Sequence, residues 1–244
     1  ITCRDWSSDV CSSDLKSFDG LELVSGGIKS LSIGPTNHRT SLSFLSSFQS
    51  LRELNIDGHE KGIENIGKIS GLEKLTLRSV TLESLEFLQS AQKLWWLALK
   101  LGGTRNLTSI KELRELKYLE LWKINGLSNL EFIEDLTGLQ FLFLQALRQV
   151  RYLPALHKLT LLRRLHLETM KGLSDLSPIT KAPILEDLLV LDTPQLSVDD
   201  FLVLNNCVNL RRMLIGLGSL KKNRAVEELL PLERVTRDDF KFIF

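Results

Sequence analysis

The sequence has few of the residues from which catalytic and metal centres are built. Its 244 residues include three cysteines and four histidines, and these do not share the spacing of metal ligands. The patterns H-E-x-x-H, G-x-S-x-G and G-x-x-x-x-G-K-S/T are absent. The chain therefore lacks the usual sequence motifs of zinc proteases, serine hydrolases and phosphate-binding loops. No apolar run reaches the roughly 18 residues of a membrane span. We therefore expect no enzyme, catalytic residue, metal, cofactor, small-molecule substrate or membrane contact.

The first fifteen residues, ITCRDWSSDVCSSDL, differ from the rest of the chain. The stretch DWSSDVCSSDL resembles the translated read-through of a common sequencing-library adapter, so residues 1–15 are set aside as a non-native segment that we expect to be disordered. A natural tail rich in serine and aspartate is the alternative. On the first interpretation the native N-terminus, with any signal peptide, is missing.

Charge and cysteine content change once those residues are set aside. Residues 16–244 contain 30 Lys+Arg and 27 Asp+Glu, a net charge of +3 with both signs interleaved. That balance is too weak to predict a nucleic-acid partner or binding to an anionic membrane. Cys207 is the one cysteine left, and a lone thiol favours a reducing compartment. We therefore expect a cytoplasmic protein.

What the chain has in abundance is one short apolar pattern, repeated every 21 to 25 residues. Nine copies of the step L-x-x-L-x-L, with other apolar side chains in place of some leucines, run from residue 28 to residue 215. A fixed period of this size is typical of a solenoid, in which each unit buries its apolar side only against its neighbours. The middle positions of the nine copies are Leu31, Leu54, Leu75, Leu97, Leu119, Leu142, Leu165, Leu188 and Met213.

Each repeat reads as a short strand followed by a short helical segment. In residues 116–138, Leu119 and Leu121 alternate with polar or aromatic residues, and this period of two predicts a strand with one buried face. Further along, Ser128 and Glu131 have the spacing of a capping box at the start of a helix. Parallel strands joined by helical crossovers would place a sheet on one side of the molecule and helices on the other.

These repeats resemble those of leucine-rich-repeat proteins, in a short form of about 22–23 residues similar to the bacterial internalins. The resemblance implies an α/β fold, a leucine-rich-repeat solenoid or horseshoe with a concave parallel β-sheet and short helices on the convex side. Many members carry a ladder of asparagines three residues after the second strand leucine. That ladder is absent here, so the turn amides must find other partners. The column reads His59, Val80, Gly102, Ile124, Leu147, Met170, Thr193 and Gly218.

The repeats also set the expected organisation of the chain. A helix is predicted over 224–230, stopped by Pro231, and a strand over 240–244, which could cover the open end of the core. The expected segments are a non-native stretch (1–15), an N-terminal cap remnant or partial repeat (16–27), a leucine-rich-repeat domain of nine repeats (28–216), and a C-terminal cap of helix plus strand (217–244).

The residues on either side of each strand leucine are expected to point to the concave face. Aromatic residues gather there on three consecutive strands, and charged residues flank them. An apolar centre with a charged rim is how protein interfaces are usually arranged. The alternative is that the aromatic rings cover one another or are covered by a missing N-terminal segment. We predict that a partner binds at Trp96, Tyr118, Trp122, Phe141, Phe143, Arg164 and His166.

Taken together, these patterns favour a non-enzymatic protein–protein interaction module that binds a partner protein or peptide on its concave face. The alternative is a substrate-targeting or sensing domain of a larger enzyme whose N-terminal part is missing. A third class, a structural or secreted surface protein, would carry an export signal in the missing stretch.

Overall fold

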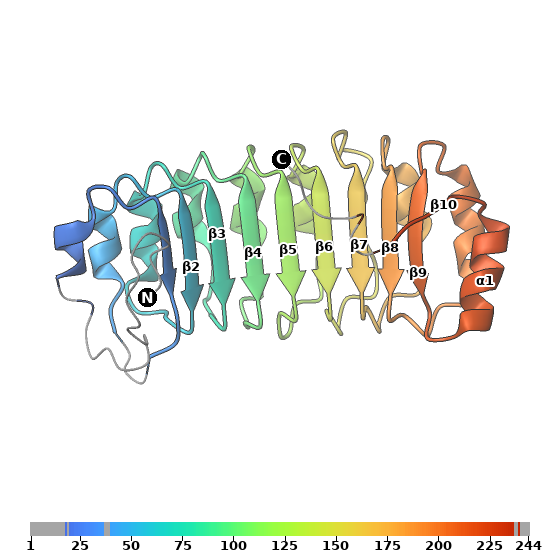
Figure 1. The fold of residues 1–244 in the computed structure, drawn as a ribbon, viewed down its shortest axis with the longest axis horizontal. Helices are drawn as coiled ribbons and strands as arrows, with labels where there is room; N and C mark the ends of the chain where they lie inside the picture. Colours follow the sequence, from blue (N-terminus) through green and yellow to red (C-terminus); the bar gives the residue numbers. More distant parts are fainter. Residues whose placement is uncertain (1–17, 19, 37–39, 237–238, 240–244) are drawn as a thin grey trace. The chain divides into compact units, whose positions relative to one another are not determined.

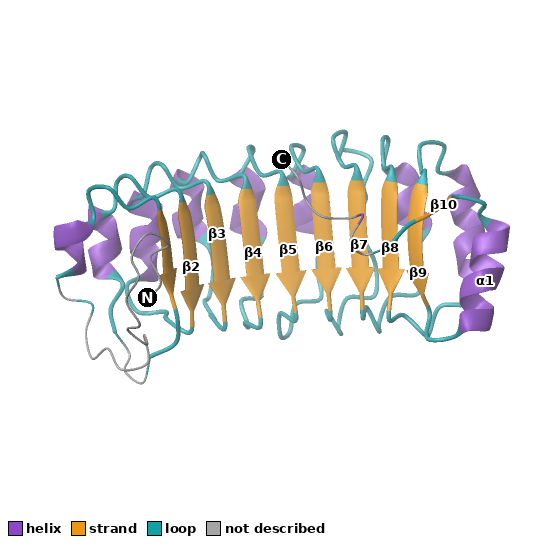
Figure 2. Ribbon diagram, viewed as in Figure 1, coloured by secondary structure: helices purple, strands orange, loops and turns teal. Residues whose placement is uncertain are grey.

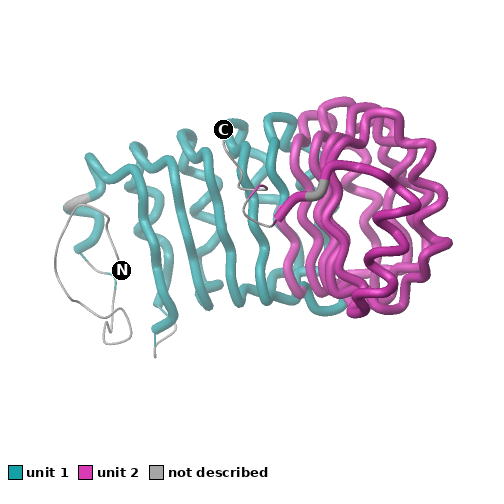
Figure 3. Tube along the Cα trace, turned by 45° about the vertical axis from the view of Figure 1, so that its right-hand side comes forward, with its two compact units in different colours: residues 1–119, 124–126 teal, residues 120–123, 127–244 magenta. Residues whose placement is uncertain are grey.

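The computed structural model divides into two compact units built from the same kind of coil. Unit 1 comprises residues 1–119 and 124–126, and unit 2 comprises residues 120–123 and 127–244 (Figure 3). The expected segments 1–15 and 240–244 lie outside the described residues. The structure describes residues 18, 20–36, 40–236 and 239.

Unit 1 is a stack of parallel strands in chain order, and each strand pairs with the next one along the chain (Figure 1). The pairing places Leu54 opposite Leu75 and Leu75 opposite Leu97, which confirms the expected register. Its elements are η2 (Leu21–Val24), β1 (Ser30–Ile33), η3 (Ser43–Ser47), β2 (Glu53–Asp57), η4 (Ile63–Lys68), β3 (Lys74–Arg78), η5 (Glu86–Ser90), β4 (Trp96–Lys100) and η6 (Thr108–Glu112), where η marks a 3₁₀-helix.

Unit 2 continues the same pattern and ends in an α-helix and a short strand. The strand β5 (Tyr118–Trp122) gives its first two residues to unit 1 and the rest to unit 2. The other elements are η7 (Glu131–Asp135), β6 (Phe141–Gln145), β7 (Arg164–Glu168), η8 (Ser177–Lys181), β8 (Asp187–Leu191), η9 (Asp199–Asn206), β9 (Arg212–Gly216), α1 (Leu220–Leu229) and β10 (Glu233–Arg234).

The strand leucines form the core of each unit. Leu75 and Leu97 in unit 1, and Leu142 and Leu165 in unit 2, have no exposed surface. Each of these side chains points from its strand to the side where the helices lie, because alternate strand residues face opposite sides of a sheet. Within each unit the helices cover one face of the strands, and the other face is left uncovered by helices (Figure 2). We call this second face the open face.

Backbone groups take over the role of the missing asparagine ladder. Within unit 2, the amide of Ala146 donates to the carbonyl oxygen of Glu168 in the next coil at 2.9 Å, and the amide of Thr169 donates to that of Leu191 at 2.8 Å. These bonds require a left-handed residue directly after the strand, a conformation that costs a non-glycine residue roughly 1–2 kcal/mol. Such residues, with φ between 51° and 57°, are Ser79, Leu101, Lys123, Ala146, Thr169 and Asp192.

Replacing Ala146 with glycine is expected to leave the stability of the protein unchanged or raise it by up to about 1 kcal/mol. Glycine removes the steric cost at φ 55°, and the greater freedom of the unfolded chain offsets part of the gain. The control is Ala98→Gly within β4, where the backbone is extended and the same change should cost about 0.5–1 kcal/mol. If urea denaturation showed the same loss of unfolding free energy for both variants, the left-handed backbone at Ala146 would not be a source of strain.

The coil between β6 and β7 departs from the predicted pattern. A helical segment is expected in each repeat, yet residues 146–163, all of them described, contain no helix. Pro154 has no amide to donate, and its ring disfavours helical angles at Leu153. The capping box predicted in the preceding coil is also not formed, because the side-chain oxygen of Asn129, rather than that of Ser128, accepts from the amide of Glu131 at 2.7 Å.

The C-terminal helix forms, but it starts earlier than predicted. Helix α1 begins at Leu220 because the hydroxyl of Ser219 accepts a hydrogen bond from the amide of Lys222 at 3.4 Å, the usual role of a serine N-cap. The helix ends before Pro231, as expected. The chain then returns to the sheet, where β10 pairs in parallel with β9 and the amide of Glu233 donates to the carbonyl oxygen of Arg211 at 3.0 Å.

Candidate binding surface on the open face

All seven residues predicted to bind a partner belong to strands, and each lies at a position facing away from the core leucines. Trp96 and Tyr118 belong to unit 1. The other five belong to unit 2, and they are Trp122, Phe141, Phe143, Arg164 and His166.

In unit 1 the aromatic residues form a tight group beside a lysine. The rings of Trp96 and Tyr118 are stacked, with centroids 3.5 Å apart and planes at 4°. The ring of Trp95 meets Trp96 edge-on at 6.1 Å. The ammonium group of Lys74 lies 4.8 Å from the centroid of Trp95 and 5.9 Å from that of Trp96, within the range of a cation–π interaction. Tyr118 is only 5% exposed, whereas Trp96 is half-buried.

In unit 2 the predicted residues come together in two pairs. The rings of Phe143 and His166 are stacked, with centroids 4.1 Å apart and planes at 10°. His166 also places Nε2 3.0 Å from Oε2 of Glu168. The guanidinium carbon of Arg164 lies 5.4 Å from the ring centroid of Phe141. Phe141 is 6% exposed, so it supports the neighbouring arginine, while Phe143 keeps part of its ring accessible.

A buried aspartate holds two arginines on the same face. Asp187 on β8 is 3% exposed. Its carboxylate accepts from Nε of Arg164 on β7 at 2.9 Å, and from Nε and the terminal nitrogen of Arg212 on β9, both at 2.7 Å. The pKa of Arg212 is raised, mainly by this hydrogen bond. Two cations share this one anion, and the carboxylates of Glu233 and Asp239 also act on Arg212.

This aspartate was not predicted as part of the site, although the sequence contains the signal. Arg164, Asp187 and Arg212 occupy equivalent positions of consecutive repeats, and neighbouring strands lie only about 4.8 Å apart. Opposite charges at aligned positions of adjacent strands attract each other. The structure also buries Glu120, which the strand pattern places on the open face, to 5% exposure.

The described residues offer little for catalysis. Burial raises the pKa of the Cys207 thiol, so the thiolate that would act as a nucleophile is disfavoured at neutral pH. Among the described residues, no group of three or more histidine, cysteine, aspartate or glutamate side chains is arranged to hold a metal ion. Nor does any helix in the described ranges have the length and apolar character needed to span a membrane. What the open face provides is fixed aromatic rings next to positive charges.

Comparison with known proteins identifies the fold. No family model and no characterised protein sequence matches the chain. Among solved structures, it is similar to an internalin (InlF) from Listeria monocytogenes, with 19% identity, a TM-score of 0.61, and coverage of 89% of this chain and 62% of that one. It is also similar to internalin C2 from the same organism, with 24% identity, a TM-score of 0.62, and coverage of 80% and 82%.

A third similar structure is the leucine-rich-repeat domain of the type III effector XopL, with 24% identity, a TM-score of 0.60, and coverage of 82% of this chain and 68% of that one. All three are leucine-rich-repeat structures. Together with the parallel strands in chain order, they establish that this chain folds as a leucine-rich-repeat solenoid, which confirms the predicted fold class. The chain spans less than two thirds of the InlF structure.

Proposed function

We propose that this chain is a non-enzymatic protein-interaction module that binds a protein or peptide partner on the open face of its sheet. The observation that carries the proposal is the pairing of Phe143 with His166 and of Phe141 with Arg164 in unit 2. Aromatic and arginine side chains are the groups that most often dominate the binding energy of protein interfaces.

These side chains are held in place before any partner arrives. Asp187 fixes Arg164, and Glu168 contacts His166. A side chain that is already ordered loses little conformational freedom on binding, and that loss is a main cost of association. Trp122 and Phe143 retain accessible ring surface beside these fixed groups. The arrangement suits a partner that brings an apolar side chain to the rings and a carboxylate or carbonyl oxygen to the arginines.

The experiment is to select peptide binders from a displayed library on the immobilised protein and then compare variants. Trp122→Ala and Phe143→Ala are each expected to weaken binding of the selected peptides by about tenfold or more, because truncating an aromatic anchor often costs about 2 kcal/mol. The control is Leu202→Ala, which removes an apolar side chain that is 49% exposed on η9, outside the strands. The affinity of this control variant for the selected peptides should not change.

Unchanged affinity of every selected peptide in both open-face variants would place the partner elsewhere and contradict the proposal. Circular dichroism and melting temperature check that the variants are folded. A melting temperature that falls by many degrees in both open-face variants would show that the rings serve the fold rather than a partner.

The alternative function is a substrate-targeting or sensing domain of a larger enzyme. One observation favours it, since the similar XopL structure is itself a leucine-rich-repeat domain of an effector protein. Sequencing the gene upstream of residue 1 separates the two, because only the alternative requires a catalytic domain in the same reading frame. We further propose a cytoplasmic location, because Cys207 is the one cysteine outside residues 1–15 and reduced thiols persist in that compartment.

A further inference from the structure

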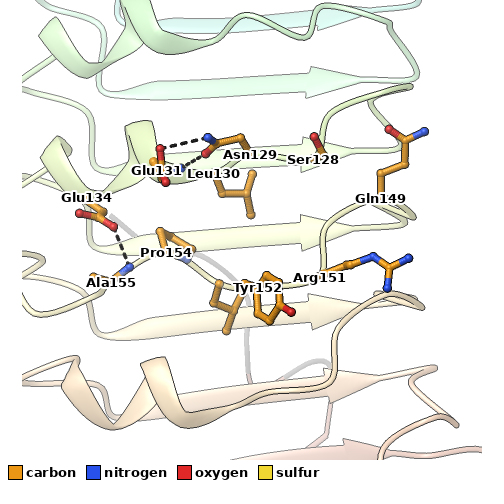
Figure 4. Close-up of a pocket in the computed structure, with 11 residues that line it drawn as sticks. Ser128, Asn129, Leu130, Glu131, Glu134, Gln149, Arg151, Tyr152, Pro154 and Ala155 are labelled. Carbon is orange, nitrogen blue, oxygen red and sulfur yellow. Dashed lines mark hydrogen bonds between the residues drawn. The ribbon is translucent and has the colours of Figure 1, made fainter.

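The irregular coil between β6 and β7 creates a pocket on the side of the sheet opposite the open face. The pocket holds about 520 Å³ and lies in unit 2, between the segment 128–134 of one coil and the segment 149–155 of the next (Figure 4). Neighbouring coils carry a 3₁₀-helix, but this coil has no helix around Pro154. Tyr152 is consequently left 70% exposed at the pocket.

The pocket has ends of opposite charge. Arg151 and Gln149 lie at the end toward which the strands point, and Glu131 and Glu134 lie nearer the other end (Figure 4). Both glutamates are engaged within the protein. Oε1 of Glu134 accepts from the amide of Ala155 at 3.0 Å, and Oε2 of Glu131 accepts from the side-chain nitrogen of Asn129 at 3.0 Å.

The basic end continues into a second pocket of about 470 Å³. It shares Gln149 and Arg151 with the first, and Arg148 and Lys171 complete its charged lining. All three cationic side chains are exposed, and none of them forms an ion pair with another described residue. Three cations that line one pocket without an ion-pair partner among the described residues can attract an anionic group, and arginine in particular binds carboxylates through two parallel hydrogen bonds.

We infer that these joined pockets bind a short acidic segment of a partner protein, with carboxylates of Asp or Glu at Arg148, Arg151 and Lys171 and an apolar side chain against Tyr152. Individual exposed ion pairs are weak, so the three cations and the aromatic ring must act together. A nucleic acid or an anionic membrane is a poorer match, because its continuous row of negative charges would also meet Glu131 and Glu134. This surface is separate from the open face of the proposed function.

The test uses a short fluorescein-labelled peptide in which glutamates flank one phenylalanine, with binding measured by fluorescence anisotropy. The double variant Arg151→Glu/Lys171→Glu should weaken binding by about tenfold or more, a change of roughly one order of magnitude in Kd. The control Lys181→Glu/Lys221→Glu makes the same change of net charge at exposed lysines outside both pockets. Its Kd should stay within about twofold of the unchanged protein.

Two further variants separate this surface from the open face. Tyr152→Ala should weaken binding of the acidic peptide, and Trp122→Ala should leave its Kd unchanged. The reverse pattern is expected for a partner that binds the open face. The inference is overturned if the peptide does not bind the unchanged protein, or if both charge-reversal variants bind it equally. It is also overturned if inorganic phosphate at the peptide's concentration displaces it, since the site would then accept any small anion.

Discussion

Replacing Leu142 with alanine is expected to lower the free energy of unfolding by about 2–5 kcal/mol. Leu142 has no exposed surface and lies opposite Leu165 on the next strand. The change removes buried methyl groups and leaves a cavity between coils that can contact only their neighbours. Because natural domains unfold with free energies of only about 5–15 kcal/mol, this loss would be a large share of the total.

Urea denaturation followed by circular dichroism measures this effect as a lower midpoint. The control is Thr137→Ala, an exposed residue five positions before Leu142 in the same coil, which should change stability by less than about 0.5 kcal/mol. If the two variants unfolded at the same urea concentration, the strand leucines could not be the shared core between coils.

Replacing Asp187 with asparagine is expected to cost about 2–4 kcal/mol, because it leaves Arg164 and Arg212 side by side without their shared carboxylate. Removing one partner of a buried ion pair typically costs about 3–5 kcal/mol. The side chains of Arg164 and Arg212 are 16% and 31% exposed, so water can solvate part of their charge and the expected loss is reduced accordingly. Asparagine has nearly the shape of aspartate, so packing is preserved and the lost charge dominates.

The neighbouring residue provides a matched control for this substitution. Glu186 forms an ion pair with Arg163 at 2.5 Å, with side chains 33% and 59% exposed, and exposed pairs contribute only about 0–1 kcal/mol. Glu186→Gln should therefore be nearly silent in thermal unfolding. A loss for Asp187→Asn no larger than that for Glu186→Gln would show that the buried aspartate is not needed to hold the two arginines.

The strands could be predicted from the sequence because their signal is local and repeated. Leu119, Leu142 and Leu165 recur at one spacing, and every copy of the pattern reports the same buried position. The return segments were less predictable, because they depend on single residues. The coil that contains Pro154 has no helix, and Ser219 starts α1 four residues before the predicted boundary at residue 224.

The candidate site was predictable only as a set of positions. Alternation along the strands places Phe143 and His166 on one face, but their stacking depends on side-chain rotamers that the sequence does not reveal. The turns show the same limit. Without the asparagine ladder, the sequence does not show which groups accept hydrogen bonds from the turn amides. The acceptors are carbonyl oxygens of the next coil, which the amides of Ala146 and Thr169 reach because these two residues have a left-handed backbone. The residue types at these positions do not predict that conformation, because the left-handed region is usually occupied by glycine.

The short strand β10 covers part of the edge of β9. An unpaired strand edge is a template on which another chain can build, and it is a common starting point for aggregation. In unit 2, Glu233 and Arg234 pair with the edge of β9 at Arg212 and Met213. Glu233 carries a charge at this edge, and Pro231, two residues before it, has no amide to offer a new strand. Two residues of backbone pairing thus cover the start of β9 and leave fewer free backbone groups at this edge for another chain to pair with.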